Sequence, residues 1–306
     1  LANKLKDPKW KPDFGPANFN PRAGATAIGA RDFLVAYNIN LNTTSTRRAN
    51  AIAFDLRENG RVKRKGDPST GEIVRDADGT PLRVPGALKS VKAIGWYIEE
   101  YGIAQVSMNL TNISITPLHI AFDEAEKSAN KRGIRVTGSE LVGLVPKKVL
   151  LDAGKFFLEK QERSTGISEE EIIHIAVKTL GLDELAPFDP KQKVIEYLLE
   201  DENTNILVSK TLTGFANETA SESPAPGGGS IAAYTGVLGV SLGTMVANLS
   251  AHKKGWDDRW EEFSYWAEQG QKLKNKLLFL VDEDTRSFNK IIDAIRLPKS
   301  SSEEKA

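Results

Sequence analysis

The chain has 306 residues, which exceeds a typical single domain, so we expect two or three domains. Its formal net charge of zero gives no long-range field for recruiting nucleic acid or an anionic membrane, and 40% hydrophobic with 27% charged residues is ordinary for a globular protein. The sequence contains no cysteine, which excludes disulfides and favours a cytoplasmic location. Its three histidines are widely separated, so no metal site is predicted.

The first part of the chain combines a loop, a strand and a helix. Residues 11–24 are rich in proline, glycine and asparagine, which indicates a surface loop of the kind that often carries binding groups. Residues 33–41 alternate apolar with small or polar residues, which predicts a half-buried strand. Thr44 or Ser45 then suits the N-cap of a helix that runs to Glu58.

A polar segment interrupts the chain after this helix. Residues 63–84 contain Asp78-Gly79 between two short runs of residues that favour strands. This pattern predicts a surface hairpin inserted into the fold.

The order of elements up to residue 137 predicts an α+β fold. Strand, helix, strand, strand, helix, strand is the order of the ferredoxin-like split βαβ arrangement, which leaves one face of an antiparallel sheet free for a partner or ligand. The later elements expected in this part are strands at residues 91–99, 103–110 and 134–137, a helix from Thr116, a loop at residues 138–146, and helices at residues 147–159, 168–180 and 190–200.

The third part of the chain is predicted to be all-α and opens on a glycine-rich turn. Ser223-Pro224-Ala225-Pro226-Gly227-Gly228-Gly229-Ser230 begins a run without charged residues that ends at Ala251. Such a turn before a helix can seat an anionic ligand on unpaired amides, although a flexible linker before a packed core helix fits equally well. The run is long enough to span a membrane, but its many Gly, Ser, Thr and Asn residues favour helix packing instead.

The remaining residues predict a long amphipathic helix at residues 256–297, with a break near Gly270. Two or three helices cannot bury this much apolar surface alone, so we expect either further helices beyond Ala306 or a homo-oligomer. Residues 300–306 resemble the start of another capped helix.

Few side chains in the sequence are candidates for chemistry. Asp284 lies four residues from both Leu280 and Phe288, so on a helix it shares the apolar stripe, where desolvation favours the protonated form that a general acid needs. Pairing with a lysine or arginine across the bundle is the alternative. His119 is interpreted as structural rather than catalytic, and His174 and His252 as surface residues. Four asparagines suit either recognition of a heteroaromatic ring or strand-end capping: Asn38, Asn40, Asn42 and Asn109.

Several stretches resemble a known family. Residues 13–16, 24–41, 93–97, 104–110 and 138–146 are similar to glutamate formimidoyltransferase. Residues 224–230 and the Leu-Val-Asp-Glu-Asp motif at residues 280–284 resemble the cyclodeaminase domain that follows it in the bifunctional formimidoyltransferase-cyclodeaminases.

The resemblance implies a folate enzyme of histidine degradation. It would transfer a formimidoyl group from N-formimidoyl-L-glutamate to tetrahydrofolate, and then cyclise the product to 5,10-methenyltetrahydrofolate with release of ammonia. Asp284 would be the cyclodeaminase catalytic residue, and Gly227, Gly228 and Gly229 would hold the pterin or glutamate part of folate. The folate-binding loop of the transferase would comprise Gly15, Pro16, Ala17, Asn18, Phe19, Asn20, Pro21, Arg22, Ala23 and Gly24.

The chain also departs from the family pattern. The family's catalytic histidine lies in an N-terminal subdomain, and none of the three histidines here matches it. We therefore expect a fragment that is inactive alone and that binds neither nucleic acid nor membranes. The alternative hypothesis is a non-catalytic scaffold that binds folate or polyglutamate. The expected division is residues 1–30 as the end of the first transferase subdomain with the folate loop, 31–200 as the second subdomain, 201–222 as a linker and first helix, and 223–306 as a truncated cyclodeaminase domain.

Overall fold

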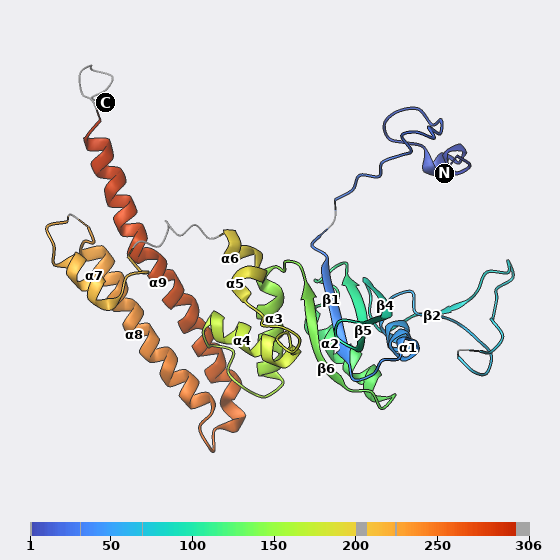
Figure 1. The fold of residues 1–306 in the computed structure, drawn as a ribbon. Coiled ribbons are helices and arrows are strands. Elements are labelled where there is room, and N and C mark those ends of the chain that lie inside the picture. The colour runs from blue at the N-terminus through green and yellow to red at the C-terminus, as the bar shows by residue number, and fades with distance from the viewer. Residues whose placement is uncertain (1, 31, 69, 200–206, 224, 298–306) are drawn as a thin grey trace. The chain divides into compact units, whose positions relative to one another are not determined.

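The computed structural model describes residues 2–30, 32–68, 70–199, 207–223 and 225–297. The chain divides into two units, the first ending at Phe33 and the second beginning at Leu34. The first unit contains two short 3-10 helices, η1 (Lys4–Lys6) and η2 (Pro8–Trp10), followed by irregular chain. All other elements belong to the second unit (Figure 1). Pro224 of the glycine-rich turn, residues 201–206 of the predicted linker and the predicted helix start at residues 300–306 lie outside the described residues.

A four-stranded antiparallel sheet forms the centre of the second unit, in the order β4-β5-β1-β6. One helix connects β1 to β4 and another connects β5 to β6, so the ferredoxin-like α+β fold predicted from the sequence is confirmed. The elements are β1 (Val35–Leu41), α1 (Thr46–Leu56), β4 (Val91–Ile98), β5 (Ile103–Leu110), α2 (Leu118–Asn130) and β6 (Val136–Val142).

The two faces of this sheet differ because successive side chains of a strand point to opposite sides. Tyr37, Ile39 and Leu41 of β1 lie in the hydrophobic core with apolar side chains of α1 and α2. Asn38 and Asn40 alternate with them and therefore lie on the opposite face. That second face also presents the exposed side chains Ile94, Trp96 and Val142.

Strand β6 is longer than predicted. Residues 138–142 were expected to form a loop, but Ser139 pairs with Ile39 and Glu140 with Asn38 across the sheet. Ser139 faces the core but is small and polar, so the sequence lacks the apolar alternation that would predict a strand here. Ser139 is satisfied by accepting a hydrogen bond from Tyr37 Oη at 2.9 Å and donating one to the Leu180 carbonyl at 2.6 Å.

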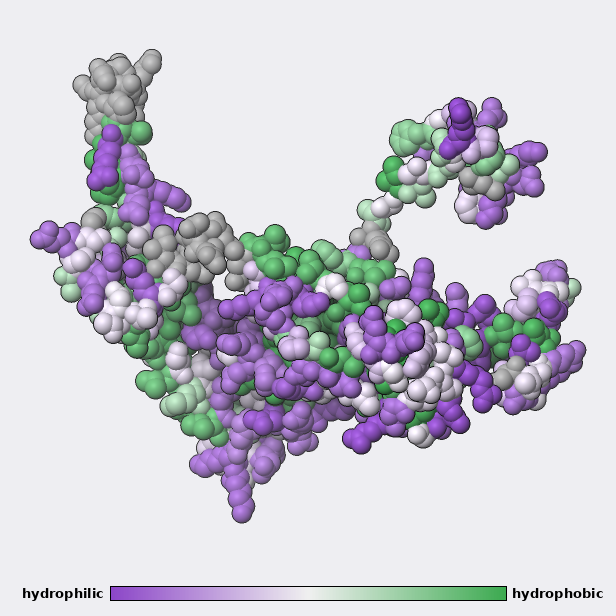
Figure 2. Space-filling model, viewed as in Figure 1, coloured by the Kyte–Doolittle hydropathy of each residue, from purple (hydrophilic) through white to green (hydrophobic). Residues whose placement is uncertain are grey.

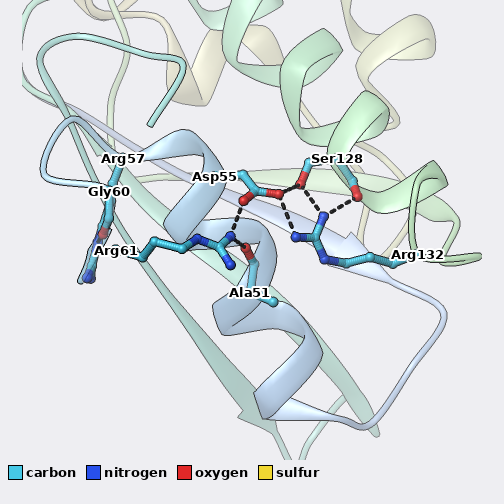
Figure 3. Close-up of polar contacts among 7 residues, drawn as sticks. All are labelled: Ala51, Asp55, Arg57, Gly60, Arg61, Ser128 and Arg132. Atoms are coloured by element: carbon cyan, nitrogen blue, oxygen red, sulfur yellow. Dashed lines mark hydrogen bonds and ion pairs between the residues drawn. The ribbon is translucent and has the colours of Figure 1, made fainter. Parts of the chain in front are cut away.

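The predicted hairpin at residues 63–84 is present and closes with β2 (Arg61–Val62) paired to β3 (Arg83–Val84). Asp55 of α1 anchors its base, because its carboxylate pairs with both Arg61 and Arg132 and accepts a hydrogen bond from Ser128 (Figure 3). Arg132 and Ser128 lie at the end of α2, so this cluster ties the hairpin to both helices. It is a structural feature of the fold.

Four helices follow the sheet: α3 (Lys147–Glu159), α4 (Glu169–Leu180), α5 (Pro190–Lys193) and α6 (Ile195–Leu199). A capping box starts α4, with Ser168 and Glu171 bonding each other's backbone amides. The single helix predicted for residues 190–200 is instead two short helices. The chain breaks at Val194, which forms a parallel bridge with Val145.

His119, in the first turn of α2, is a buried structural side chain. Its ring stacks on Phe156 with centroids 4.4 Å apart, and its Nδ1 has no hydrogen-bond partner within the described chain. Burial lowers the pKa of His119, against the smaller opposing effects of Asp152 and Asp123 and alongside that of Lys148. The neutral imidazole is therefore the form that the folded protein accommodates.

This histidine gives a testable pH dependence. A proton binds His119 more readily in the unfolded chain, so its contribution to stability is complete above about pH 6.5, the ordinary histidine value, and is lost as pH falls below it. We expect the urea midpoint of the wild type to fall more steeply between about pH 7 and pH 5 than that of His119→Phe. Parallel profiles for the two proteins would contradict this assignment.

The last part of the second unit is a pair of long helices, α8 (Gly228–Ala251) and α9 (Trp260–Ile295), preceded by α7 (Leu212–Thr219). A short 3-10 helix, η4 (Asp257–Arg259), leads into α9. The break predicted near Gly270 is wrong, because α9 continues through this residue. Glycine is needed there for close packing, since a Cβ would overlap the side chain of Thr244 on α8.

By length and composition alone, α8 is the one described helix that could cross a membrane. Only 22% of its most apolar window is buried in this structure. A core helix of a soluble protein meets the same two criteria, so the finding does not assign α8 to a membrane.

A buried polar seam joins the loop between α3 and α4 to the α8–α9 pair. The Thr165 amide donates to Ser264 Oγ at 3.0 Å, and Asn248 Nδ2 donates to the Gly166 carbonyl at 2.9 Å. Glu268 accepts from Thr165 Oγ1 and pairs with Lys155. Burial alone would raise the pKa of Glu268, but the hydrogen bonds from Thr165 and Lys155, together with the charges of Lys155 and Lys272, hold that pKa below its ordinary value.

Candidate active site

Asp284 and the glycine-rich turn, which are 54 residues apart in sequence, meet in the structure. Asp284 Oδ2 accepts hydrogen bonds from the Ser230 amide at 2.9 Å and from Ser230 Oγ at 3.2 Å. The carboxylate therefore lies at the N-terminus of α8, where unpaired amides and the helix dipole favour a negative charge. The glycine-rich turn suggested a seat for an anionic ligand at this position. In the structure, the carboxylate of Asp284 itself occupies it.

Glycine at position 229 is required for this contact. A Cβ built on Gly229 would overlap the Asp284 carboxylate, and one on Gly227 would lie 4.0 Å from its Oδ2. Oδ1 accepts no hydrogen bond from any described residue. Asp284 is half-buried, and its Oδ1 is the carboxylate atom that lies nearest to the position of a Cβ on Gly229.

Asp282, two residues earlier, has a different role. Its side chain is only 3% exposed, and it accepts hydrogen bonds from the amides of Leu207 at 2.7 Å and Val208 at 3.3 Å. Asp282 therefore fixes the chain that enters the helical region onto α9. The buried position predicted for Asp284 is occupied by Asp282, because the stripe of α9 that faces the protein includes Val281 and Asp282. Within the described residues, neither acid pairs with a lysine or arginine.

The other predicted binding residues lie in the first unit. Residues 15–24 are exposed throughout, as a surface loop requires, with the Asn20 side chain bonding the amides of Arg22 and Ala23. The structure describes this loop by itself, as part of the first unit. Its role in folate binding stays a prediction, as do the predicted domain limits.

A second polar group, missed in the sequence, occupies the sheet face that lacks α1 and α2. Gln105 Nε2 donates to Asn40 Oδ1 at 2.8 Å, Asn40 Nδ2 donates to Glu184 at 2.7 Å, and Trp96 Nε1 donates to Gln105 Oε1 at 3.2 Å. Asn38 Nδ2 donates to Glu140 Oε2 at 3.1 Å. Only the pairing of four strands reveals this network, so no local pattern could have predicted it.

The network also revises the interpretation of the asparagines. The amides of Asn38 and Asn40 are engaged inside the protein, so they orient carboxylates rather than contact a ring directly. Asn42 bonds the backbone of Arg135, as strand-end capping predicts. Asn109 is exposed on the same face as Asn38.

The described residues contain no group of three or more His, Asp or Glu side chains placed to hold a metal ion. The polar atoms at the two groups are those of carboxylates, carboxamides, backbone amides, the Ser230 hydroxyl and the Trp96 indole. Together the ferredoxin-like module and the helical pair, whose first helix begins against a carboxylate, define a two-part α+β protein with its candidate active site on the helical part.

Known proteins share both parts. The family model described as "Formiminotransferase domain" matches residues 36–200, and the model described as "Formiminotransferase-cyclodeaminase" matches residues 211–306. The chain therefore belongs to the formiminotransferase-cyclodeaminase family.

Individual relatives cover one or both parts. The Mus musculus formimidoyltransferase-cyclodeaminase is 42% identical over 306 residues, which is 100% of this chain and 53% of the relative. The Thermoplasma acidophilum glutamate formimidoyltransferase is 36% identical over 159 residues, or 52% of this chain and 44% of the relative. The Methylorubrum extorquens methenyltetrahydrofolate cyclohydrolase is 34% identical over 98 residues, or 32% of this chain and 47% of the relative. The chain thus spans about half the length of the relatives it matches.

Proposed function

We propose that this chain carries parts of two consecutive folate activities. The first transfers a formimidoyl group from N-formimidoyl-L-glutamate to N5 of tetrahydrofolate. The second cyclises 5-formimidoyltetrahydrofolate to 5,10-methenyltetrahydrofolate and releases ammonia. The observation that carries the proposal is the contact between Asp284 and the first turn of α8. It places a carboxylate, whose Oδ1 accepts no hydrogen bond from the described residues, next to Gly228, where an added Cβ would meet no atom within 4 Å.

The cyclisation needs a proton to move between two nitrogens. N10 attacks the carbon of the protonated formimidoyl group, the bond from that carbon to the terminal nitrogen breaks, and ammonia leaves. The proton lost by N10 must reach the departing nitrogen. Asp284 Oδ1 is suited to accept the proton from N10 and to deliver it to the departing nitrogen. The Ser230 amide meanwhile holds Oδ2 in place.

The same proposal includes a cytoplasmic location, self-association, and no binding of nucleic acid or membranes. The absence of cysteine and the net charge of zero support the location and the lack of nucleic-acid binding. Exposed apolar side chains along the helical pair support self-association, and Figure 2 shows apolar surface on α8. They include Leu238, Leu242, Val246 and Leu249 of α8 and Tyr265, Trp266, Phe279 and Ile291 of α9.

The test is a calorimetric titration of the chain with 5-formyltetrahydrofolate. We expect saturable binding that is abolished by deleting residues 13–24, because that loop is the proposed folate-binding segment. A deletion of similar length within the hairpin at residues 63–84 is the control and should leave binding unchanged. A folded chain that does not bind the folate would contradict the proposal.

A further inference from the structure

A small pocket at the base of the hairpin is lined by basic side chains. It has a volume of about 250 Å³ and lies where the end of α1, strand β3 and strand β4 meet (Figure 1). Arg57 follows α1, Arg83 belongs to β3, and Lys92 belongs to β4. None of the described residues that line this pocket is an aspartate or a glutamate. Because the whole chain has 41 basic and 41 acidic residues, this excess of positive charge is local.

Both arginines of the pocket are held by the turn that follows α1. Arg57 Nε donates to the Gly60 carbonyl at 2.8 Å, and its guanidinium lies 4.3 Å from the centroid of the Phe54 ring. Arg83 Nη1 donates to the Asn59 carbonyl at 3.0 Å. Asn59 and Gly60 are consecutive, so the two guanidinium groups are ordered around the same turn. Their positions are thus set by the fold before any ligand binds.

The positive charges of this pocket are not balanced within the described chain. No aspartate or glutamate there forms an ion pair with Arg57, Arg83 or Lys92. Asp55 and Glu58, the acids nearest to Arg57 in sequence, are bonded to other groups. Burial and the charge of Arg83 both lower the pKa of Arg57. Like charges held side by side repel each other, and an anion placed between them removes that cost.

We propose that this pocket binds a small oxyanion, a phosphate or a carboxylate group, between Arg57 and Arg83. A guanidinium carries N–H donors in a fixed planar arrangement that matches two oxygens of such a group. Within the described chain, neither arginine uses its Nη2 group in a hydrogen bond. Because the backbone already orders both side chains, binding costs little conformational entropy. The site does not depend on the proposed function, and it makes the base of the hairpin a binding element.

The experiment is an NMR titration of the full chain with inorganic phosphate and, separately, with succinate, at constant ionic strength. The signal observed is the Nε–Hε pair of Arg57, assigned through its contact with the Phe54 ring. Arg83→Gln removes one guanidinium from the pocket, and circular dichroism verifies that the variant is folded. Arg75→Gln is the matched control, since Arg75 is another hairpin arginine that bonds a carbonyl, that of Gly79, but does not line the pocket.

We expect the Arg57 signal to shift saturably with at least one anion, and the anion that acts identifies the group as phosphate or carboxylate. Arg83→Gln should weaken that binding by about 10- to 100-fold, the effect of losing a charge-assisted hydrogen bond, while Arg75→Gln should match wild type. Lys92→Gln, a second variant, should weaken it by about 2- to 5-fold, as expected of an exposed charge.

Two results would overturn this inference. One is an Arg57 signal that moves with neither anion, and the other is an Arg83→Gln protein that binds the anion as tightly as Arg75→Gln does. Both results would leave the proposed function intact, because its test measures the binding of 5-formyltetrahydrofolate.

Discussion

Asp284→Asn is expected to reduce cyclodeaminase turnover by about 100- to 10,000-fold, the usual contribution of general acid–base catalysis. The asparagine retains an oxygen that can accept from the Ser230 amide, so the start of α8 keeps its position. Carboxamides do not exchange protons near neutral pH, however, and the transfer from N10 to the departing nitrogen loses its carrier. Turnover should therefore fall while folding and folate affinity change little.

The measurement is ammonia release from 5-formimidoyltetrahydrofolate. It is made in a chimera that places this chain in the frame of a full-length relative, since the chain spans about half of that length. Glu283→Gln is the matched control, because Glu283 lies next to Asp284 on α9 and pairs with Arg286 instead. Turnover by Asp284→Asn within a few-fold of the Glu283→Gln value would remove Asp284 from the mechanism.

Asp282→Ala is expected to lower the free energy of unfolding by about 2–5 kcal/mol, because each buried amide donor left without an acceptor costs about 1–3 kcal/mol. The two donors are the amides of Leu207 and Val208, and Leu207 is 4% exposed. Without the carboxylate, the chain that enters the helical region is no longer held on α9. The effect on stability should thus be large at position 282 and small at position 284.

Urea denaturation measures the change in stability, and hydrogen exchange at Leu207 and Val208 locates it. Asp293→Ala provides the control, since Asp293 is an exposed acid on the same helix, where substitutions change stability by about 0.5 kcal/mol or less. If the Asp282→Ala protein is as stable as this control and the exchange at both amides is unchanged, Asp282 does not hold the linker.

Local signals in the sequence determined much of the fold. The alternation at residues 33–41 and the Ser168 capping box each depend on residues that are close in sequence. Their order was enough to predict the ferredoxin-like topology, and the motifs at residues 224–230 and 280–284 pointed to the family. The run without charged residues located α8, and periodicity located α9 apart from the break expected near Gly270.

The tertiary structure decided what depends on residues far apart in sequence. Glycine is usually a helix breaker, but Gly270 lies within α9 because Thr244 of α8 packs against it. Helical spacing placed Asp284 in the buried stripe, whereas the contacts of Leu207 and Ser230 show that Asp282 is buried and Asp284 meets the start of α8. The position of Glu140 likewise depended on the register of three strands, because one residue of slip would turn its side chain to the other face.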